Sequence, residues 1–284
     1  LSFVQLVYRF GVHLLNGEAA KKILDDDKIA DRNIRVAAVN AIRLVRPQAN
    51  AGDKQAALLK DCLDTLWGYY QKKLGKGDQL IQSHALPAIA QLLGRGGDTE
   101  GKYKDAFAKE LSGAKKRQID MYRSAAVALG MLAKSREEEK SDGKYSDALL
   151  NYIKKGKDEQ ARYFSTMALG KIGGVANRNE LLKILAKGQK ATERPWAAIS
   201  LGVLAHHQME RDGKGATVDE TTGRALHQQF NAMKNPSAQA GMAIGLGLCK
   251  FKEAAADMQD ALLKYKNKDE LAGDICIGLA LMGA

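Results

Sequence analysis

The sequence predicts an all-α protein built from repeated pairs of helices, and three observations lead to that prediction. A pattern of small residues followed by Leu or Ile recurs seven times along the chain. Segments with apolar residues three or four positions apart precede most of these copies, as expected of amphipathic helices. No stretch alternates apolar and polar residues over a useful length, and runs of β-branched residues are lacking, so strands are not expected.

The seven copies define the second helix of each expected pair. Each copy has an anchor position, preceded directly by Leu or Ile, with small residues two and five positions before it. Since these offsets fall on one helical face, we expect this face to pack against a neighbouring helix. The anchors lie about 39 residues apart on average and are Arg43, Ala90, Gly130, Gly170, Gly202, Gly245 and Gly278. The second helices are therefore expected near residues 34–45, 82–93, 121–133, 161–173, 194–205, 237–248 and 270–282.

Most second helices are preceded by a segment that fits an amphipathic first helix. Between the segments, Gly, Asp, Asn and Lys cluster in a way typical of turns. A single helix pair of this kind cannot bury its apolar faces alone, so the pairs are expected to stack on one another. The expected first helices are Gln55–Leu74, Tyr103–Leu111, Tyr145–Ile153, Asn179–Leu185, Thr222–Met233 and Ala254–Tyr265.

The pattern AxxALGxLG within such a helix pair resembles the HEAT repeat, including the HEAT-like repeats of phycobilisome lyases. The resemblance covers about residues 34–283. It implies one domain over residues 1–284, folded as a right-handed α-solenoid (superhelix) of about seven antiparallel HEAT-like helix pairs. In that family an Asp begins the second helix and an Arg follows within its first turns, joining adjacent repeats. Asp31 with Arg35 and Asp158 with Arg162 match this arrangement, while the second, sixth and seventh copies lack the Arg.

A surface strip on the second helices is the candidate partner-binding site. Positions three and seven before each anchor point roughly away from the buried face, and many of them are apolar. An apolar, Met-containing strip beside glycine can accept a helix or an extended peptide. In the alternative interpretation, these residues contact the neighbouring repeat. The candidate residues are Arg123, Val127, Tyr163, Met167, Ile199 and Met242. The predicted function is that of a non-catalytic scaffold or adaptor that binds a protein or peptide partner.

Charge makes nucleic acid the alternative partner. The chain has 44 Lys and Arg against 33 Asp and Glu, a net charge of +11, and residues 101–200 carry 21 against 12, a local excess of +9. The HEAT-like alkylpurine DNA glycosylases bind DNA in a basic concave cradle, so the resemblance allows such a role. Candidate contacts are Lys115, Lys116 and Arg117. However, second helices line the concave side of HEAT solenoids, whereas many lysines here fall in first helices and turns, where solubility explains them.

Motifs for catalysis, cofactors or metals are not found, so we expect none of the three. Gly96–Tyr103 has the spacing of a phosphate loop, but it ends in Tyr and carries two acids, so an exposed turn is expected. His206 and Glu210 are four residues apart and fit an ion pair near a helix end better than a metal site. Without His-Glu dipeptides, the chain does not match the HEAT-like deoxyhypusine hydroxylases. A phycobilin-lyase-like enzyme is the enzymatic alternative, based on repeat similarity alone.

The three cysteines indicate the redox compartment of the chain, and its hydropathy bears on membrane insertion. Cys62, Cys249 and Cys276 are far apart and lie among apolar residues, so buried free thiols and a reducing compartment are expected. This favours the cytoplasm, although an N-terminal signal could be missing, since the chain does not begin with Met. No apolar run reaches the roughly 18 residues of a membrane-spanning helix, so membrane insertion is not expected.

The last expected helix is apolar on nearly every side. Terminal repeats of solenoids usually present a polar outer face. We therefore expect this helix to be covered by further repeats, a second copy of the chain or a partner, and to support self-association of the chain as given. The residues concerned are Leu271, Ile275, Cys276, Ile277, Leu279, Leu281 and Met282.

Overall fold

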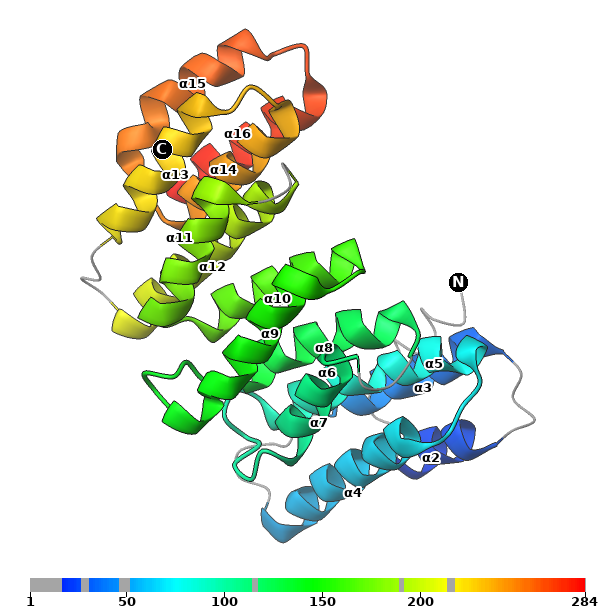
Figure 1. Cartoon of the computed structure of the whole chain (residues 1–284). Coiled ribbons are helices and arrows are strands. Elements are labelled where there is room, and N and C mark those ends of the chain that lie inside the picture. The colour runs from blue at the N-terminus through cyan, green and yellow to red at the C-terminus, as the bar shows by residue number, and fades with distance from the viewer. Residues whose placement is uncertain are drawn as a thin grey trace. The chain divides into compact units, whose positions relative to one another are not determined.

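Helices, joined by turns and loops, make up most of the described part of the chain. The computed structural model describes residues 17–26, 31–45, 52–113, 117–188, 192–213 and 218–283, and no β-strand occurs among them. The predicted all-α class is thus confirmed for this part of the chain. The chain divides into two compact units, Leu1–Ala133 (unit 1) and Lys134–Ala284 (unit 2) (Figure 1). One continuous domain over residues 1–284 stays a prediction.

Unit 1 places the predicted second helices side by side. Helix α3 packs on α6, and α6 packs on α8, while α2, α4 and α7 each pack on one of these three. Helix α2 was not expected from the sequence; α4 and α7 lie where first helices are expected. The helices of unit 1 are α2 (Gly17–Asp25), α3 (Arg32–Arg43), α4 (Gly52–Gln71), α5 (Lys76–Ser83), α6 (Ala85–Leu93), α7 (Lys102–Leu111) and α8 (Ile119–Leu132).

The second copy of the repeat pattern, predicted as one helix over residues 82–93, is split between two helices. Helix α5 ends at Ser83, and α6 begins at Ala85. Pro87 explains the break, because it has no N–H to donate to the carbonyl of Ser83, and its ring clashes with that carbonyl in a continuous helix.

A buried polar network joins the helices of unit 1. The Gln82 side-chain amide donates to the carbonyl oxygens of Tyr69 and Tyr70 at 2.8 Å each, near the end of α4. Its oxygen accepts a bond of 3.1 Å from Arg117. The Arg117 guanidinium also lies 3.4 Å from the buried Glu110 carboxylate, which accepts a 2.7 Å bond from the Tyr70 hydroxyl. These bonds fix α4, α5 and α7 relative to one another.

Unit 2 consists of two layers of helices (Figure 1). Helices α10, α12, α14 and α16 pack on one another in this order and form one layer, and α9, α11, α13 and α15 each pack on a helix of that layer. The helices are α9 (Gly143–Lys155), α10 (Glu159–Ile172), α11 (Val175–Lys187), α12 (Glu193–Asp212), α13 (Glu220–Ala232), α14 (Pro236–Leu248), α15 (Ala255–Lys264) and α16 (Asp269–Met282). Two short 3-10 helices, Lys140–Asp142 and Lys252–Ala254, precede α9 and α15.

Side-chain caps define where several of these helices begin. The carboxylates of Asp158 and Asp219 accept bonds of 2.8 and 3.2 Å from backbone N–H groups in the first turns of α10 and α13. The Asn235 side chain accepts a bond of 3.3 Å in the same way at the start of α14. Each cap satisfies an N–H that has no partner within the helix. Between α10 and α11, Gly173 and Gly174 adopt positive φ angles of 77° and 87° and turn the chain back.

Glycine lets the second helices of unit 2 approach until their backbones touch. A Cβ added to Gly202 of α12 would lie 2.8 Å from the carbonyl oxygen of Gly245 in α14, too close for a real contact. A Cβ added to Gly245 would lie 2.6 Å from the carbonyl oxygen of Ala198. Gly170 meets the Ser200 carbonyl, and Gly278 meets the Ala243 carbonyl, in the same way. The glycine anchors are therefore required by close packing within this layer.

Candidate binding surface

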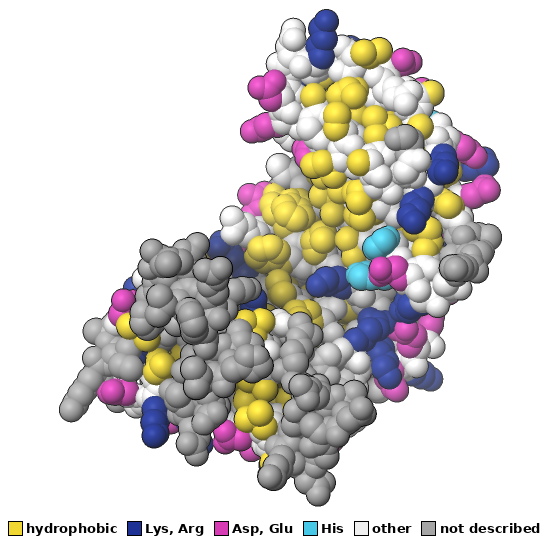
Figure 2. Space-filling model, turned by 180° about the vertical axis from the view of Figure 1, so that it is seen from behind, with side chains coloured by type: hydrophobic (Ala, Val, Ile, Leu, Met, Phe, Trp, Pro, Cys, Tyr) yellow, Lys and Arg dark blue, Asp and Glu magenta, His cyan; other side chains and the backbone are white. Residues whose placement is uncertain are grey.

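An apolar surface lies over the α10–α16 layer of unit 2. Figure 2 shows hydrophobic side chains gathered along this side of the unit. Five of the half-buried apolar residues on α10 and α12 form what we call the unit 2 strip. The strip consists of Tyr163, Met167, Trp196, Ile199 and Val203.

A pair of stacked aromatic rings stands at one end of the strip. The rings of Tyr163 and Trp196 are 5.2 Å apart and inclined by only 13°. The Tyr163 hydroxyl donates a bond of 2.6 Å to Glu159, which also accepts a 3.3 Å bond from Thr192. Burial, followed by the bond to Glu159, raises the pKa of Tyr163, so the hydroxyl remains a donor at neutral pH. The pair is thus held in place while part of its surface stays accessible.

Met167 is positioned beside this pair by α12. The buried Ser200 hydroxyl lies 3.3 Å from the Met167 sulfur and 2.6 Å from the Trp196 carbonyl oxygen. Ser200 therefore links the thioether of α10 to the backbone of α12. The result is a surface of aromatic, thioether and aliphatic groups on two rigidly packed helices.

The structure divides the predicted site residues into two groups. Tyr163, Met167 and Ile199 are half-buried and belong to the strip, whereas Met242 is fully buried with 0% exposure. The prediction needs correction at Met242, because Gly241 lies against Pro195 and brings α14 close to α12, enclosing the neighbouring side chain. Arg123 and Val127 are half-buried on α8 of unit 1 and are described only within that unit.

Trp196 was not among the predicted site residues. The offset of seven positions from the anchor Gly202 pointed to Pro195, and Trp196 follows it. The signal was available in the sequence, because the chain has only two tryptophans and one of them lies at the edge of the predicted face.

The outer face of α16 differs from the prediction in detail. Ile277 and Leu281 are 50% and 42% exposed, while Ile275 and Leu279 are buried against the unit. Cys276 is also exposed, which corrects the expectation that all three cysteines are buried; Cys62 and Cys249 are buried. Self-association through this helix stays a prediction, and Ile277 and Leu281 are the residues that would mediate it.

The candidate nucleic-acid contacts are only partly described. Lys115 and Lys116 lie outside the described residues. Arg117 is described, and its guanidinium is engaged by Gln82 and Glu110 with its side chain only 13% exposed. A guanidinium held in this way stabilises the interior of unit 1 and is not presented at its surface to bind a phosphate.

In the turn that resembles a phosphate loop, a carboxylate of the chain itself occupies the place of a phosphate. The buried Asp98 carboxylate accepts bonds of 3.0 and 2.7 Å from the N–H groups of Tyr103 and Lys104 at the start of α7. These are the donors that a phosphate would need. The turn was expected to be exposed, but only half of its residues are. Asp98, Gly101 and Tyr103 are buried, and Asp98 is only 4% exposed.

Metal binding and membrane crossing find no support among the described residues. No group of three or more His, Cys, Asp or Glu side chains within them is arranged to hold a metal ion. His206 and His207 approach the two oxygens of Glu210 at 3.5 and 3.2 Å. Across the same residues, every helix is too short or too polar to span a bilayer.

Comparison with known proteins does not assign the chain to a family. Neither a protein-family model nor a curated protein sequence matches the chain. The functional argument therefore depends on the residues themselves.

Proposed function

We propose that the chain is a non-catalytic scaffold that binds a protein or peptide partner through the unit 2 strip. The stacked, half-exposed Tyr163 and Trp196 are the observation that carries the proposal. Tryptophan and tyrosine are enriched among the residues that contribute most to protein–protein affinity. Met167 beside them adds a flexible apolar side chain that adapts to a partner's shape.

We further propose that the helix pairs form a right-handed HEAT-like solenoid of about seven pairs. Two arginines support the resemblance to HEAT repeats. Arg162 of α10 donates to the Gly156 carbonyl oxygen at the end of α9 at 2.9 Å, and Arg35 of α3 donates to the Asp26 carbonyl oxygen after α2 at 3.2 Å. Arg162 also lies 3.6 Å from Glu193 of α12, so it connects one pair to the next. This is the linking role that the HEAT resemblance assigns to that position.

Affinity capture with matched variants tests the strip. We expect wild-type protein to retain a protein partner from native lysate, Ile199→Lys to lose it, and Leu263→Lys to keep it. Leu263 is the control because it is 71% exposed on α15, which does not contribute to the strip. Unfolding curves of the three proteins establish that each is folded. Equal retention by Ile199→Lys and wild type would overturn the proposal.

A purified partner allows the aromatic pair to be measured directly. We expect Trp196→Ala to raise the dissociation constant at least about 30-fold, as truncation of a central aromatic residue does. A change below about threefold would remove the aromatic pair from the binding site.

The alternatives make different predictions in the same capture. If nucleic acid is the partner, nuclease treatment will release the retained material, and Ile199→Lys will behave as wild type. Such a result would favour the basic residues 101–200, including Lys115 and Lys116, over the strip. A phycobilin-lyase-like activity stays an expectation of the repeat resemblance alone.

A further inference from the structure

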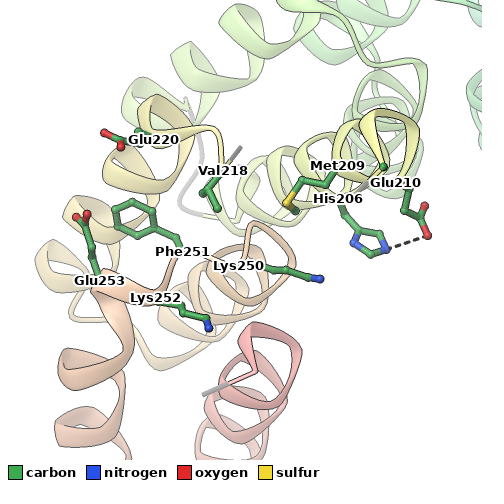
Figure 3. A pocket seen from close by; sticks show the side chains of 10 residues that line it. His206, Met209, Glu210, Val218, Glu220, Lys250, Phe251, Lys252 and Glu253 are labelled. Carbon is green, nitrogen blue, oxygen red and sulfur yellow. Dashed lines mark ion pairs between the residues drawn. The ribbon is translucent and has the colours of Figure 1, made fainter. Parts of the chain in front are cut away.

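A cavity in unit 2 lies apart from the aromatic pair of the strip. It has a volume of about 690 Å³ and opens where the second half of α12, Val218 and the turn between α14 and α15 meet (Figure 3). This volume is in the range of pockets that enclose small molecules.

One part of the cavity is apolar. Met209, Val218 and Phe251 come from three different segments and surround its centre (Figure 3). Phe251 is only 3% exposed, and its ring lies directly against Gly223 of α13, where any Cβ would collide with it. The ring is therefore fixed, and it offers a rigid apolar wall to a ligand.

Lys250 reaches this cavity from an unusual backbone position. Its φ of 54° is the only positive φ of a non-glycine residue among the residues described. It follows the end of α14, where Phe251 N–H donates to the Leu246 carbonyl and Lys250 N–H donates to the Gly247 carbonyl. Glycine is the usual residue in such a turn. Lys250 therefore holds a strained backbone conformation that glycine would adopt without strain, and strain of this kind clusters at functional sites.

The charges around the cavity leave two lysines available. Glu210 lies beside His206 and His207, and Glu220 pairs with Arg224 at 3.0 Å. Figure 3 shows Glu253 on the far side of the Phe251 ring from Lys250. Within the described part of the chain, no hydrogen bond or ion pair is found for the side-chain amino groups of Lys250 and Lys252. Two cations thus stand at one side of the apolar part of the cavity.

We propose that this cavity binds a small amphiphilic anion. Its apolar part packs against Met209, Val218 and Phe251, and its carboxylate or phosphate group pairs with Lys250 and Lys252. Charge-assisted bonds to the lysines orient the ligand, and burial of its apolar part provides most of the affinity. This binding does not depend on a protein partner at the unit 2 strip.

Two fluorescent dyes of similar size test the proposal. Anilinonaphthalene sulfonate carries the anion, and phenylnaphthylamine is its neutral counterpart. We expect the double variant Lys250→Gly, Lys252→Ala to weaken binding of the sulfonate dye about tenfold and to leave the neutral dye unchanged. Lys250→Gly suits a positive φ, so the variant is expected to fold at least as stably as wild type. The control Lys154→Ala, Lys155→Ala removes two exposed charges from α9 and should bind both dyes as wild type does.

Further arms locate the dye and identify the head group. Met209→Ala should weaken both dyes, whereas Ile199→Lys in the strip should weaken neither. Octanoate and octyl phosphate should each displace the sulfonate dye at lower concentration than octanol, and the more effective of the two identifies the preferred anion. Equal affinity of the sulfonate dye for wild type and the double lysine variant would overturn the proposal. So would loss of the dye in Ile199→Lys, or displacement by octanol as readily as by both anions.

Discussion

In unit 2 the second helices meet backbone to backbone at Gly202 and Gly245, while two of the three corresponding positions in unit 1 hold Arg43 and Ala90. The space between helices in unit 1 is filled by side chains instead. The rings of Trp67 in α4 and Tyr103 in α7 lie 5.0 Å apart, and the buried network around Gln82 and Glu110 joins three helices. One repeat pattern therefore supports two ways of packing.

The difference teaches where each unit is vulnerable. The packing of unit 2 requires glycine at its anchor positions, since a side chain there would push two helices apart. Unit 1 depends on the buried ion pair of Arg117 with Glu110, because a buried charge that loses its partner is costly. The following predictions compare the two directly.

The largest effect is expected at a position that both units share. Ile89 of α6 and Leu201 of α12 directly precede their anchors, and both are 0% exposed. Replacing either with Ala should lower the free energy of unfolding by about 2–5 kcal/mol, as large-to-small changes in a core do. Chemical denaturation measures the loss. A loss below about 0.5 kcal/mol in both would show that the repeat columns are not core positions.

The next effect separates the units. Arg117→Ala leaves the buried Glu110 without its cation, and we expect a loss of about 3 kcal/mol confined to unit 1. Hydrogen exchange should rise in α4, α5 and α7 and stay unchanged in α12 and α14. Lys109→Ala, which removes an exposed charge from α7, is the matched control. Equal increases in exchange in both units would contradict the independence of the polar network.

A smaller effect of opposite sign in two variants tests the glycine packing. Gly245→Ala should destabilise unit 2 by about 1–3 kcal/mol, because the new methyl group overlaps the α12 backbone. Gly273→Ala in α16 should instead stabilise it by about 0.5–1 kcal/mol, since no atom lies within 4 Å of the added Cβ. Thermal unfolding of the two variants decides, and stabilisation by both would refute close backbone contact.

The smallest effect is a dependence on pH. Burial alone would raise the pKa of Asp219, but hydrogen bonds from Thr222 and the nearby Arg178 guanidinium hold it below its ordinary value. A lowered pKa in the folded state means that this stabilisation is present above the ordinary aspartate pKa. It is lost as pH falls through the folded value. Asp219→Asn should cost about 1 kcal/mol at pH 7 and remove this part of the acid dependence in denaturant titrations. An unchanged pH profile would show that the ion pair is not formed in solution.

Helix positions could be predicted from the sequence because apolar periodicity is a local property. The expected first helix Tyr145–Ile153 lies within α9, and the expected second helix over residues 161–173 nearly coincides with α10. The break before α6 was not predicted, although Pro87 indicates it. The repeat pattern continues through this segment, but the missing N–H of Pro87 interrupts the helix. Helix α2 had no matching segment among the predicted first helices.

The binding surface could be predicted only in part. Periodicity fixes the face on which Met167 and Met242 lie, but it does not set the distance to the next helix. That distance depends on close contacts such as Gly241 against Pro195, which enclose Met242 and leave Met167 accessible. The cavity beside Phe251 had no sequence signal, since its walls come from three segments brought together by folding.

The two tryptophans fall one to each unit, and this gives the protein a built-in optical reporter for either half. Trp67 lies edge-on to Tyr103, with the Lys102 amino group 5.0 Å from its ring centroid, whereas Trp196 is stacked flat on Tyr163. Because indole emission depends on its immediate surroundings, the two fluorophores differ in what they sense. In a Trp67→Phe variant, tryptophan emission comes from unit 2 alone, and we expect it to change when a partner covers the strip. In a Trp196→Phe variant, tryptophan emission comes from unit 1 alone and reports the unfolding of that unit. A single chain can therefore report on its two halves without any attached label.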